Sequence, residues 1–379
     1  MKKDWTYKKL GEVAEIKAGF TPSSSELHEA GEYPYYKVSD MNTTGNEVFL
    51  ISTLSYVKQS KKYFPKGSIA FPKNGAAIAT NKKRILKYDS IVDLNTGVCI
   101  FDSDILPKFG YYWFQNIDFR NYTRGGALPT LDIKTISLKA IPIPPISIQE
   151  SIVRELDAIH GILEKKQEQL RELDNLAQAI FHEMFGDPIT NPKQWEVKKL
   201  GEVCEALTGI TYKPADVADD GIIVLRSGNI QEGEIDLQDL VRIKKKIADK
   251  YFVQPGDILM CSRNGSFRLV GKAAKIPVLE ETMTWGAFMT VIRSNYNPYI
   301  LSFLRTPAFR EQLTNAKTTT VNQITISMIN NISLPLPPLS LQQSFAAKIE
   351  AIEAQKTAIR QSIREVEALL VERMDNYFS

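Results

Sequence analysis

The sequence contains little of what would assign it to several common classes of protein. Its three cysteines, Cys99, Cys204 and Cys261, lie far apart in 379 residues and form no C-x-x-C pair. This spacing argues against a disulfide framework or a cysteine zinc site, and it suits a reducing compartment such as the cytoplasm. No run of about 18 or more apolar residues occurs, and no apolar segment follows the charged start. We therefore expect neither a membrane span nor a secretory signal.

Recognisable catalytic motifs are also missing. The segment from Gly265 to Ala273 is one residue too long for a P-loop and has Ala where that loop needs Ser or Thr. Asn297-Pro298-Tyr299 lacks the second proline of the Asn-Pro-Pro-Tyr motif of adenine methyltransferases. The three histidines, His28, His160 and His182, have no second ligand at metal spacing. We expect a chain with no catalytic residue, no metal and no cofactor of its own.

Neither sign of charge dominates, but charge is unevenly distributed along the chain. Lys and Arg number 47 and Asp and Glu 44, for a net charge of +3. Residues 1–146 carry +6 and residues 186–339 carry +2, whereas residues 147–185 carry −4 and residues 340–379 carry −1. A polarised distribution of this kind indicates that the two positive segments contact an anion and that the two acidic segments serve as a spacer.

The most informative feature is an internal repeat. Trp5 and the Lys-Lys-Leu-Gly-Glu-Val of residues 8–13 return as Trp195 and residues 198–203. Gly-x-Thr at residues 19–21 and Asn-Gly at residues 74–75 return at the same offset of 190. The proline-rich residues 141–149 return as residues 334–342, at an offset of 193. The chain is therefore two copies of one unit whose intervening loops have diverged.

Each copy ends in a long helical pattern, over residues 147–185 and 340–379. Apolar residues recur every three or four positions for nearly five heptads, with polar residues elsewhere. Such a narrow stripe predicts that the two helices pair with each other as an antiparallel coiled coil, although packing of each helix on its own domain is an alternative. The predicted seam consists of Ile152, Leu156, Ile159, Leu163, Leu170, Leu173, Ile349, Ile352, Ile359, Ile363, Val366 and Leu370.

The segments 1–146 and 186–339 have the pattern of mixed α/β domains. Short β-rich runs, such as residues 97–101, 222–225 and 287–292, are separated by Gly, Pro, Asn and Lys. Short helices are predicted near residues 109–116 and 299–304. The predicted fold class is α+β: two tandem mixed domains separated by two long helices in an antiparallel coiled coil, with a pseudo-two-fold internal repeat.

The duplicated order of motifs resembles the specificity subunit of a type I restriction–modification system. In each copy, Trp and Leu-Gly-Glu-Val are followed by Gly-x-Thr. A segment with Lys or Arg first and Asp or Asn fourth comes next, at residues 37–41 or 226–230. Next come Pro-Lys-Gly-Ser-Ile (65–69) or Pro-Gly-Asp-Ile-Leu (255–259), the Pro-Pro segment, and Gln149 or Gln342. Residues 184–188, Met-Phe-Gly-Asp-Pro, connect to the second Trp. The resemblance extends over essentially the whole chain.

The resemblance implies a division of labour. Residues 1–146 and 186–339 would be two target recognition domains, each reading half of a split sequence in double-stranded DNA. Residues 147–185 and 340–379 would be spacer helices that dock two methyltransferase (modification) subunits. Those partners would carry S-adenosylmethionine and methylate adenine, and restriction subunits would add ATP- and Mg-dependent cleavage.

We expect DNA contacts mainly at basic and amide residues that match between the copies. Lys or Arg is suited to phosphate or guanine, and Asn to adenine. The alternative for the Asn-Gly pairs is a purely structural role in a turn. The candidate DNA-binding residues are Lys37, Lys73, Asn74, Lys82, Lys83, Arg84, Arg124, Arg226, Arg263, Asn264, Arg268, Lys317 and Thr318.

Three functions are compatible with these observations. The first is non-catalytic recognition of a bipartite DNA site within a restriction–modification complex. The second is an enzyme that acts on DNA alone, against which the missing catalytic motifs argue. The third is a coiled-coil adaptor that joins proteins without DNA specificity.

Overall fold

The computed structural model describes residues 5–126, 128–315 and 322–379. The chain forms two compact units, and each combines segments that are distant in sequence. Unit 1 comprises Met1–Gln167 and Arg360–Ser379, and unit 2 comprises Glu168–Ile359. Each unit therefore contains one globular body, the first part of one long helix and the last part of the other. The division into residues 1–146, 147–185, 186–339 and 340–379 stays a prediction, because these units cut through both helices.

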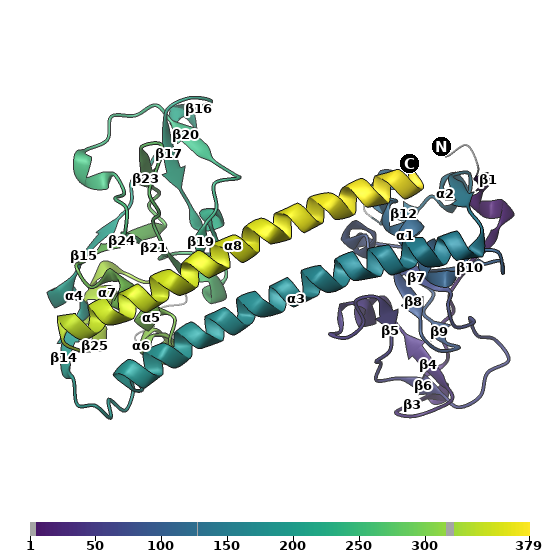
Figure 1. Ribbon diagram of the computed structural model, residues 1–379, viewed down its shortest axis with the longest axis horizontal. Coiled ribbons are helices and arrows are strands. Elements are labelled where there is room, and N and C mark those ends of the chain that lie inside the picture. Colours follow the sequence, from purple (N-terminus) through teal and green to yellow (C-terminus); the bar gives the residue numbers. More distant parts are fainter. Residues whose placement is uncertain (1–4, 127, 316–321) are drawn as a thin grey trace. The chain divides into compact units, whose positions relative to one another are not determined.

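The two long helices are α3, Ile146–Phe185, and α8, Leu339–Phe378 (Figure 1). Both begin directly after a Pro-Pro pair, where Pro ends the preceding strand. The buried side chain of Gln149 donates to the carbonyls of Pro144 (2.9 Å) and Asp104 (2.7 Å), and Gln342 donates to Pro337 (2.7 Å). The repeated glutamine thus fastens the start of each helix to the turn before it.

Helix α3 ends where the sequence predicts. Gly186 has a φ of +80°, a left-handed conformation that costs Gly little. The indole N–H of Trp195 donates to the carbonyl of Phe185 at 2.9 Å, which satisfies one of the carbonyls left unpaired at the helix end. The repeated tryptophan therefore has a structural role in this copy.

The residues of the predicted seam are less accessible than their neighbours on the helices. All twelve of its residues are buried or half-buried, whereas most of the positions between them are exposed. In unit 2, Phe345 of α8 packs on Phe181 and Phe185 of α3, and Lys356 pairs with Asp174 at 2.8 Å. Higher residue numbers on one helix meet lower numbers on the other, so the pairing is antiparallel.

The helix ends also pack on the globular cores. Ile152, Leu156 and Phe378 belong to the main core of unit 1, and in that unit Tyr377 donates to Glu155 at 2.5 Å. Phe181, Phe185 and Phe345 belong to the main core of unit 2. Coiled-coil pairing and packing on each globular body, considered as alternatives from the sequence, both occur in different stretches of the helices.

The globular body of unit 1 is built on two sheets of order β2-β10-β7-β8-β5 and β3-β6-β4-β9, with two-stranded sheets β1-β13 and β11-β12. Its remaining helices are α1, Pro107–Gln115, and α2, Ile133–Ser137. The strands are β1 Thr6–Lys9, β2 Ala14–Ala18, β3 Leu27–His28, β4 Tyr33–Tyr36, β5 Phe49–Leu50, β6 Tyr56–Val57, β7 Ile69–Pro72, β8 Arg84–Leu86, β9 Ile91–Val92, β10 Thr96–Phe101, β11 Thr123–Arg124, β12 Thr130–Leu131 and β13 Ala140–Ile143.

Unit 2 has sheets of order β15-β24-β21-β22 and β16-β20-β17-β23, with pairs β14-β25 and β18-β19. Its helices besides α3 and α8 are α4, Leu200–Val203, α5, Asn297–Leu304, α6, Pro307–Asn315, and α7, Ile326–Asn331. The strands are β14 Glu196–Lys199, β15 Glu205–Thr208, β16 Val217–Ala218, β17 Ile222–Leu225, β18 Ile230–Gln231, β19 Glu234–Ile235, β20 Val241–Ile243, β21 Ile258–Cys261, β22 Ala273–Lys275, β23 Met283–Trp285, β24 Met289–Arg293 and β25 Ser333–Leu336.

The two bodies share one topology, which confirms the repeat. The run β2-β10-β7-β8 corresponds to β15-β24-β21-β22, and in each case the chain order of the strands is first, last, second, third. The parallel pair β4-β9 corresponds to β17-β23. The repeated Gly-x-Thr has a physical reason, because a Cβ on Gly19 would lie 2.1 Å from the carbonyl oxygen of Asp93, and one on Gly209 would lie 2.3 Å from that of Trp285.

The predicted short elements were confirmed with small shifts. Residues 222–225 form β17, residues 97–101 fall within β10, and the two predicted helices are α1 and α5. The run 287–292 begins two residues too early, since β24 starts at Met289. Among the described residues, no helix is both long enough and apolar enough to cross a membrane.

Candidate nucleic-acid interface

In each unit, a loop made of a basic residue and Asn-Gly lies just after the end of a central strand. Lys73 follows β7, and its N–H donates to the carbonyl of Asn95 at 2.7 Å. Arg263 lies just beyond β21, and its N–H donates to the carbonyl of Phe288 at 3.1 Å. Asn95 and Phe288 each immediately precede the strand that pairs with β7 or β21. The two loops therefore occupy the same place in the two copies.

In unit 1 a third chain segment joins this loop. Asn74 forms a bridge with Thr130, and Thr130 lies opposite Arg124 in the β11-β12 hairpin. The backbone of Thr130 thus pairs with Asn74 on one side and with Arg124 on the other. The Arg124 side chain, 63% exposed, pairs with Asp132 at 2.5 Å. The Thr135 hydroxyl and the Arg124 guanidinium hold the pKa of Asp132 below its usual value.

In unit 2 the corresponding loop borders a polar hollow of about 530 Å³. The guanidinium carbon of Arg263 lies 5.1 Å from the centre of the Phe288 ring, and Phe288 is 58% exposed. An exposed ring beside an arginine can stack on a base while the guanidinium reaches a base edge or a phosphate. The hollow is lined by Ser227, Arg263, Asn264, Gly265, Phe288 and Asn322.

Phe288 and Asn322 were not among the candidates from the sequence. Phe288 lies in an apolar run that predicts a buried strand, but the N–H of Met289 donates to the carbonyl of Gly286 at 2.8 Å. This turn places Phe288 outside the strand. The glycine before the run is the one sequence signal that indicates the bend.

The two asparagines have a structural role as well as a candidate role in binding. The Oδ1 atom of Asn264 accepts the N–H of Ser266 at 3.0 Å, an Asx turn, while its Nδ2 points to the Ser227 hydroxyl at 3.4 Å. In unit 1 the Nδ2 of Asn74 lies 3.4 Å from the Oδ1 of Asn95, and Gly75 has a φ of +77°. The turn role is confirmed for Asn264, and contact of either residue with a base stays a prediction.

Lys37 and Arg226 follow β4 and β17, the first strands of the two parallel pairs. Arg226 is half-buried and pairs with Asp239 at 3.0 Å, and the adjacent Ser227 lines the hollow. The structure therefore brings Arg226, Arg263 and Asn264 into one region of unit 2. Lys37 is exposed, with its ammonium 5.9 Å from the centre of the Tyr35 ring.

The cluster at residues 82–84 requires a correction. Lys83 is fully buried: its ammonium donates to Asn81 Oδ1 and to the carbonyl of Ile117, both at 2.7 Å, and lies 4.2 Å from the centre of the Phe119 ring. Burial lowers the pKa of Lys83 to about 7. The prediction that Lys83 contacts DNA is wrong, because its ammonium lies in the protein interior.

Arg84 is also largely committed within the protein. Its guanidinium donates to the carbonyls of Lys83 (2.8 Å) and Met41 (3.1 Å), and burial lowers its pKa. We correct its role to a structural one, since both of its terminal nitrogens donate to carbonyls of the protein. Lys82 donates to Asn42 Oδ1 and stays partly accessible.

The remaining candidates are less well placed. Arg268 is exposed on the short turn Phe267–Leu269 but does not line the hollow. Lys317 and Thr318 lie outside the described residues. Within the described ranges, no group of three or more His, Cys, Asp and Glu side chains is placed to hold a metal ion.

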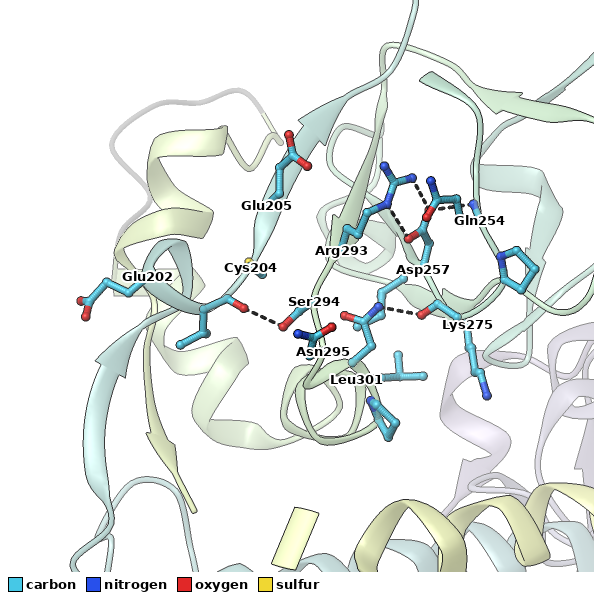
Figure 2. A pocket seen from close by; sticks show the side chains of 16 residues that line it. Glu202, Cys204, Glu205, Gln254, Asp257, Lys275, Arg293, Ser294, Asn295 and Leu301 are labelled. Atoms are coloured by element: carbon cyan, nitrogen blue, oxygen red, sulfur yellow. Dashed lines mark hydrogen bonds and ion pairs between the residues drawn. The ribbon is translucent and has the colours of Figure 1, made fainter. Parts of the chain in front are cut away.

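A second hollow of unit 2 lies at the opposite end of β21, beside Gly256 and Asp257 (Figure 2). Arg293 binds Asp257 there with two hydrogen bonds, of 2.9 and 2.7 Å. The guanidinium is thereby neutralised by a carboxylate that is almost fully buried. This hollow is separate from the Arg263 loop, because the strand runs between them.

Two copies of one α+β body, each with a basic-amide loop at the end of a central strand, define a protein with two recognition units. The chain belongs to the family described as the type I restriction modification DNA specificity domain, which matches residues 2–173 and 192–368. The two matched ranges agree with the internal repeat. This family supports DNA recognition and not the adaptor alternative.

Individual relatives agree with the family. The chain is 25% identical to the MjaIX specificity subunit of Methanocaldococcus jannaschii, over 92% of this chain and 87% of that one. It is 27% identical to the EcoKI specificity subunit of Escherichia coli, over 47% of this chain and 40% of that one. The chain thus spans well under half of the E. coli relative in that match.

Two solved structures share the fold. The S subunit of the type I restriction–modification system from M. genitalium matches with a TM-score of 0.54 at 13% identity, covering 100% of this chain and 98% of that one. A chain from a study of complex assembly and conformational transition of the type I R-M system matches with a TM-score of 0.57 at 19% identity, with the same coverage.

Proposed function

We propose that this chain is the DNA sequence-recognition subunit of a type I restriction–modification complex and has no catalytic activity of its own. Each unit reads one half of a bipartite, asymmetric site in double-stranded DNA. The observation that carries the proposal is the matched pair of loops, at Lys73-Asn74 and Arg263-Asn264, in the same place of two otherwise divergent bodies. Matched positions with different side chains are what two readers of different half-sites require.

The differences between the loops support asymmetric reading. Arg263 offers a planar fork of donors that suits guanine, and Phe288 beside it offers a surface for stacking. Lys73 offers a single ammonium, and its neighbour is Asn95. The two units therefore present different donor sets to DNA.

Membership of the same family supports a proposal for the assembly. Two modification subunits would carry S-adenosylmethionine and methylate adenine, and restriction subunits would supply ATP- and Mg-dependent cleavage. The long paired helices are the element that spaces the half-sites and docks the modification subunits. The complex would act in the cytoplasm, where its DNA substrate lies.

The test is a footprint with a domain exchange. The assembled complex should protect two short DNA segments separated by an unprotected gap, and its affinity should fall steeply with salt because phosphate contacts release counterions. Replacing residues 1–146 by those of a relative should change one half-site and leave the other intact. A single continuous footprint, a change in both half-sites or affinity independent of salt would contradict the proposal.

A matched experiment separates recognition from catalysis. The purified chain, incubated with DNA, Mg²⁺ and S-adenosylmethionine, should neither methylate nor cut. Adding the modification subunit should give adenine methylation at the bipartite site alone. Methylation or cleavage by the isolated chain would refute the non-catalytic assignment.

A further inference from the structure

The candidate DNA loop at Lys73 continues directly into the interior of unit 1. A short helical turn, Ala76–Thr80, follows the loop, and Asn81 ends this turn with a φ of +54°. Two residues further on lies Lys83, which is fully buried although it belongs to a basic run. The loop therefore has a fixed point in the protein interior only a few residues beyond it.

The ammonium of Lys83 joins the chain after this loop to a second segment, the chain after α1. It donates to Oδ1 of Asn81 and to the carbonyl of Ile117, both at 2.7 Å. The same Oδ1 accepts the N–H of Phe119 at 2.9 Å. Lys83 and Asn81 thus fasten the two segments together, because one amide oxygen accepts a hydrogen bond from each of them.

The same two segments meet again at the DNA loop itself. The N–H of Gly75 donates to the carbonyl of Pro129 at 2.7 Å, and the N–H of Leu131 donates to the carbonyl of Lys73 at 2.9 Å. The segments are therefore linked at both of their ends, once beside Lys73 and once at Lys83. Loss of either link would free the loop to take other positions.

Unit 2 makes the corresponding link with the cation on the opposite segment. Gly271, with a φ of +82°, stands where unit 1 has Asn81, at the offset of 190. The guanidinium of Arg310, on α6, donates to the carbonyl of Val270 at 2.5 Å. Arg310 is half-buried, and burial lowers its pKa. The chain after α5 is thereby attached to the chain after the Arg263 loop.

The link in unit 2 also has a counterpart at the DNA loop. The N–H of Asn264 donates to the carbonyl of Asn322 at 3.2 Å, and Arg263 forms a bridge with Gln323. The segment that begins at Asn322 therefore lies against the Arg263 loop, as Pro129 and Leu131 lie against the loop of unit 1. Both units share one arrangement, in which a cation in the interior holds the segments at the end away from the DNA loop.

We propose that Lys83 and Arg310 are positioning residues for DNA reading, each of which sets the loop of its own unit without touching DNA. The proposal rests on the proposed function, since it concerns how the two loops of that function are held. Hydrogen bonds to base edges tolerate only small displacements, so a reading loop must be held in place. Removing either cation leaves a buried carbonyl without its donor, and this carbonyl regains a partner only when one segment moves. The loop of the same unit moves with that segment, whereas the other unit keeps its own link.

The experiment measures the sequence preference of each half-site separately. The assembled complex is bound to DNA libraries randomised in one half-site at a time, and exchange of residues 1–146 identifies the half-site of unit 1. Lys83→Met, which keeps a long unbranched side chain, should lower the discrimination against a mismatched base pair in that half-site from about tenfold to under about threefold. Discrimination in the half-site of unit 2 should stay near about tenfold, which also shows that the variant is folded. Arg310→Met should give the reverse result.

Two further variants make the test specific. Asn81→Gly removes the shared Oδ1 atom but permits the left-handed backbone, as Gly271 does in unit 2. It should act like Lys83→Met, and it carries the test for unit 1 if Lys83→Met does not fold. Lys356→Met is the control, because it removes a buried lysine that pairs with carboxylates of the long helices. It should leave both preferences unchanged.

A folded variant that loses stability but keeps both preferences would show a merely structural role and overturn the proposal. Loss of preference at both half-sites from Lys83→Met or Arg310→Met, or the same loss from Lys356→Met, would also overturn it. Each of these results leaves the proposed function standing. If the unmodified complex shows no split preference for DNA, the proposed function fails and the positioning role fails with it.

Discussion

Units 1 and 2 have the same strand order but different chemistry at both ends of the central strand. At one end, Lys73 beside Asn95 in unit 1 corresponds to Arg263 beside Phe288 in unit 2. At the other end, Ser68 and Ile100 of unit 1 correspond to the ion pair of Asp257 and Arg293 in unit 2. The strands between these ends are buried in both units. The comparison teaches that the buried core fixes the topology. The residues at the strand ends are free to differ, because water or a partner can form hydrogen bonds with their polar groups.

The ion pair between Asp257 and Arg293 shows how the buried charges of the two units can differ while the strand order stays the same. In unit 1 the register of β7 and β10 places Ser68 and Ile100 where unit 2 has Asp257 and Arg293. A buried charge is tolerated only with a partner, so both charges must be present or both absent. Each unit satisfies this condition in its own way.

The largest expected effect concerns the aromatic contacts that attach the helix ends to each core. Phe185 packs on Phe181, Tyr299 and Phe345, with ring centres 4.9 to 5.2 Å apart. Phe378, at the equivalent end of α8, packs on Phe109 at 5.3 Å and is more exposed. Phe185→Ala should lower the free energy of unfolding by about 3–5 kcal/mol, and Phe378→Ala by less.

Urea denaturation measures both changes. Phe288→Ala serves as the control, because its ring is exposed and its loss should cost under about 1 kcal/mol of stability. Equal losses for Phe185→Ala and Phe288→Ala would contradict the packing described for unit 2.

The second prediction uses Lys83, which is peculiar to unit 1. Its pKa is lowered to about 7 by burial, whereas an unfolded lysine titrates near about 10.4. Between these values the unfolded state binds a proton that the folded state releases, so stability should rise as the pH is raised from 7 to 10. Below pH 7 both states are charged and the burial penalty is fully present.

Lys83→Met should remove this rise, which is on the order of a few kcal/mol since each pKa unit corresponds to about 1.4 kcal/mol. The measurement is urea unfolding at several pH values between 7 and 10. Lys82→Met, at a neighbouring side chain that reaches solvent, is the control and should leave the slope unchanged. A slope that persists in Lys83→Met would assign the pH dependence to another group.

The third prediction sharpens the contrast between the two loops. Arg263→Ala should weaken DNA binding by about 1–3 kcal/mol and relax the sequence preference at one half-site. Lys73→Ala should weaken binding with little change in preference if its ammonium contacts phosphate. Binding to a randomised DNA library separates the two results, and Arg268→Ala, outside the hollow, is the control. Loss of preference at both half-sites from either change would contradict separate reading.

The smallest effect is expected at Lys356, a buried lysine in the helix pair of unit 2. It binds Asp174 at 2.8 Å and Glu353 at 3.0 Å, while the equivalent position of α3, at the offset of 193, is Leu163. Replacing a buried ion pair by an apolar residue is often neutral or stabilising. Lys356→Leu should therefore change the stability by under about 1 kcal/mol.

Asp174→Asn is the informative companion, because it keeps the buried ammonium and weakens its partner. We expect this change to cost more than Lys356→Leu in thermal unfolding. The reverse order would mean that the ion pair itself stabilises the pairing of the helices.

The sequence by itself determined the repeat, the two long helices and the position of some core strands, among them β10, β17 and β24. These depend on periodic apolar residues and on residues with few conformational options, such as the glycine at 19 and 209 and the Pro-Pro pairs. Burial of an apolar stripe and close approach of two backbones restrict the residue type at particular positions, so both are visible in the sequence pattern. The strand order, in contrast, needed the tertiary structure, because register across distant segments leaves no periodic signal.

The tertiary structure alone decided which charged and aromatic side chains are accessible. The run Lys82-Lys83-Arg84 has the composition of a solvated surface, yet carbonyls of Ile117 and Met41, distant in sequence, receive two of its three side chains. Phe288 belongs to an apolar run and is nevertheless exposed by the turn at Gly286. A hydrogen-bond partner or a hollow is assembled from segments that meet only in the folded chain, and for that reason neither is readable from local sequence.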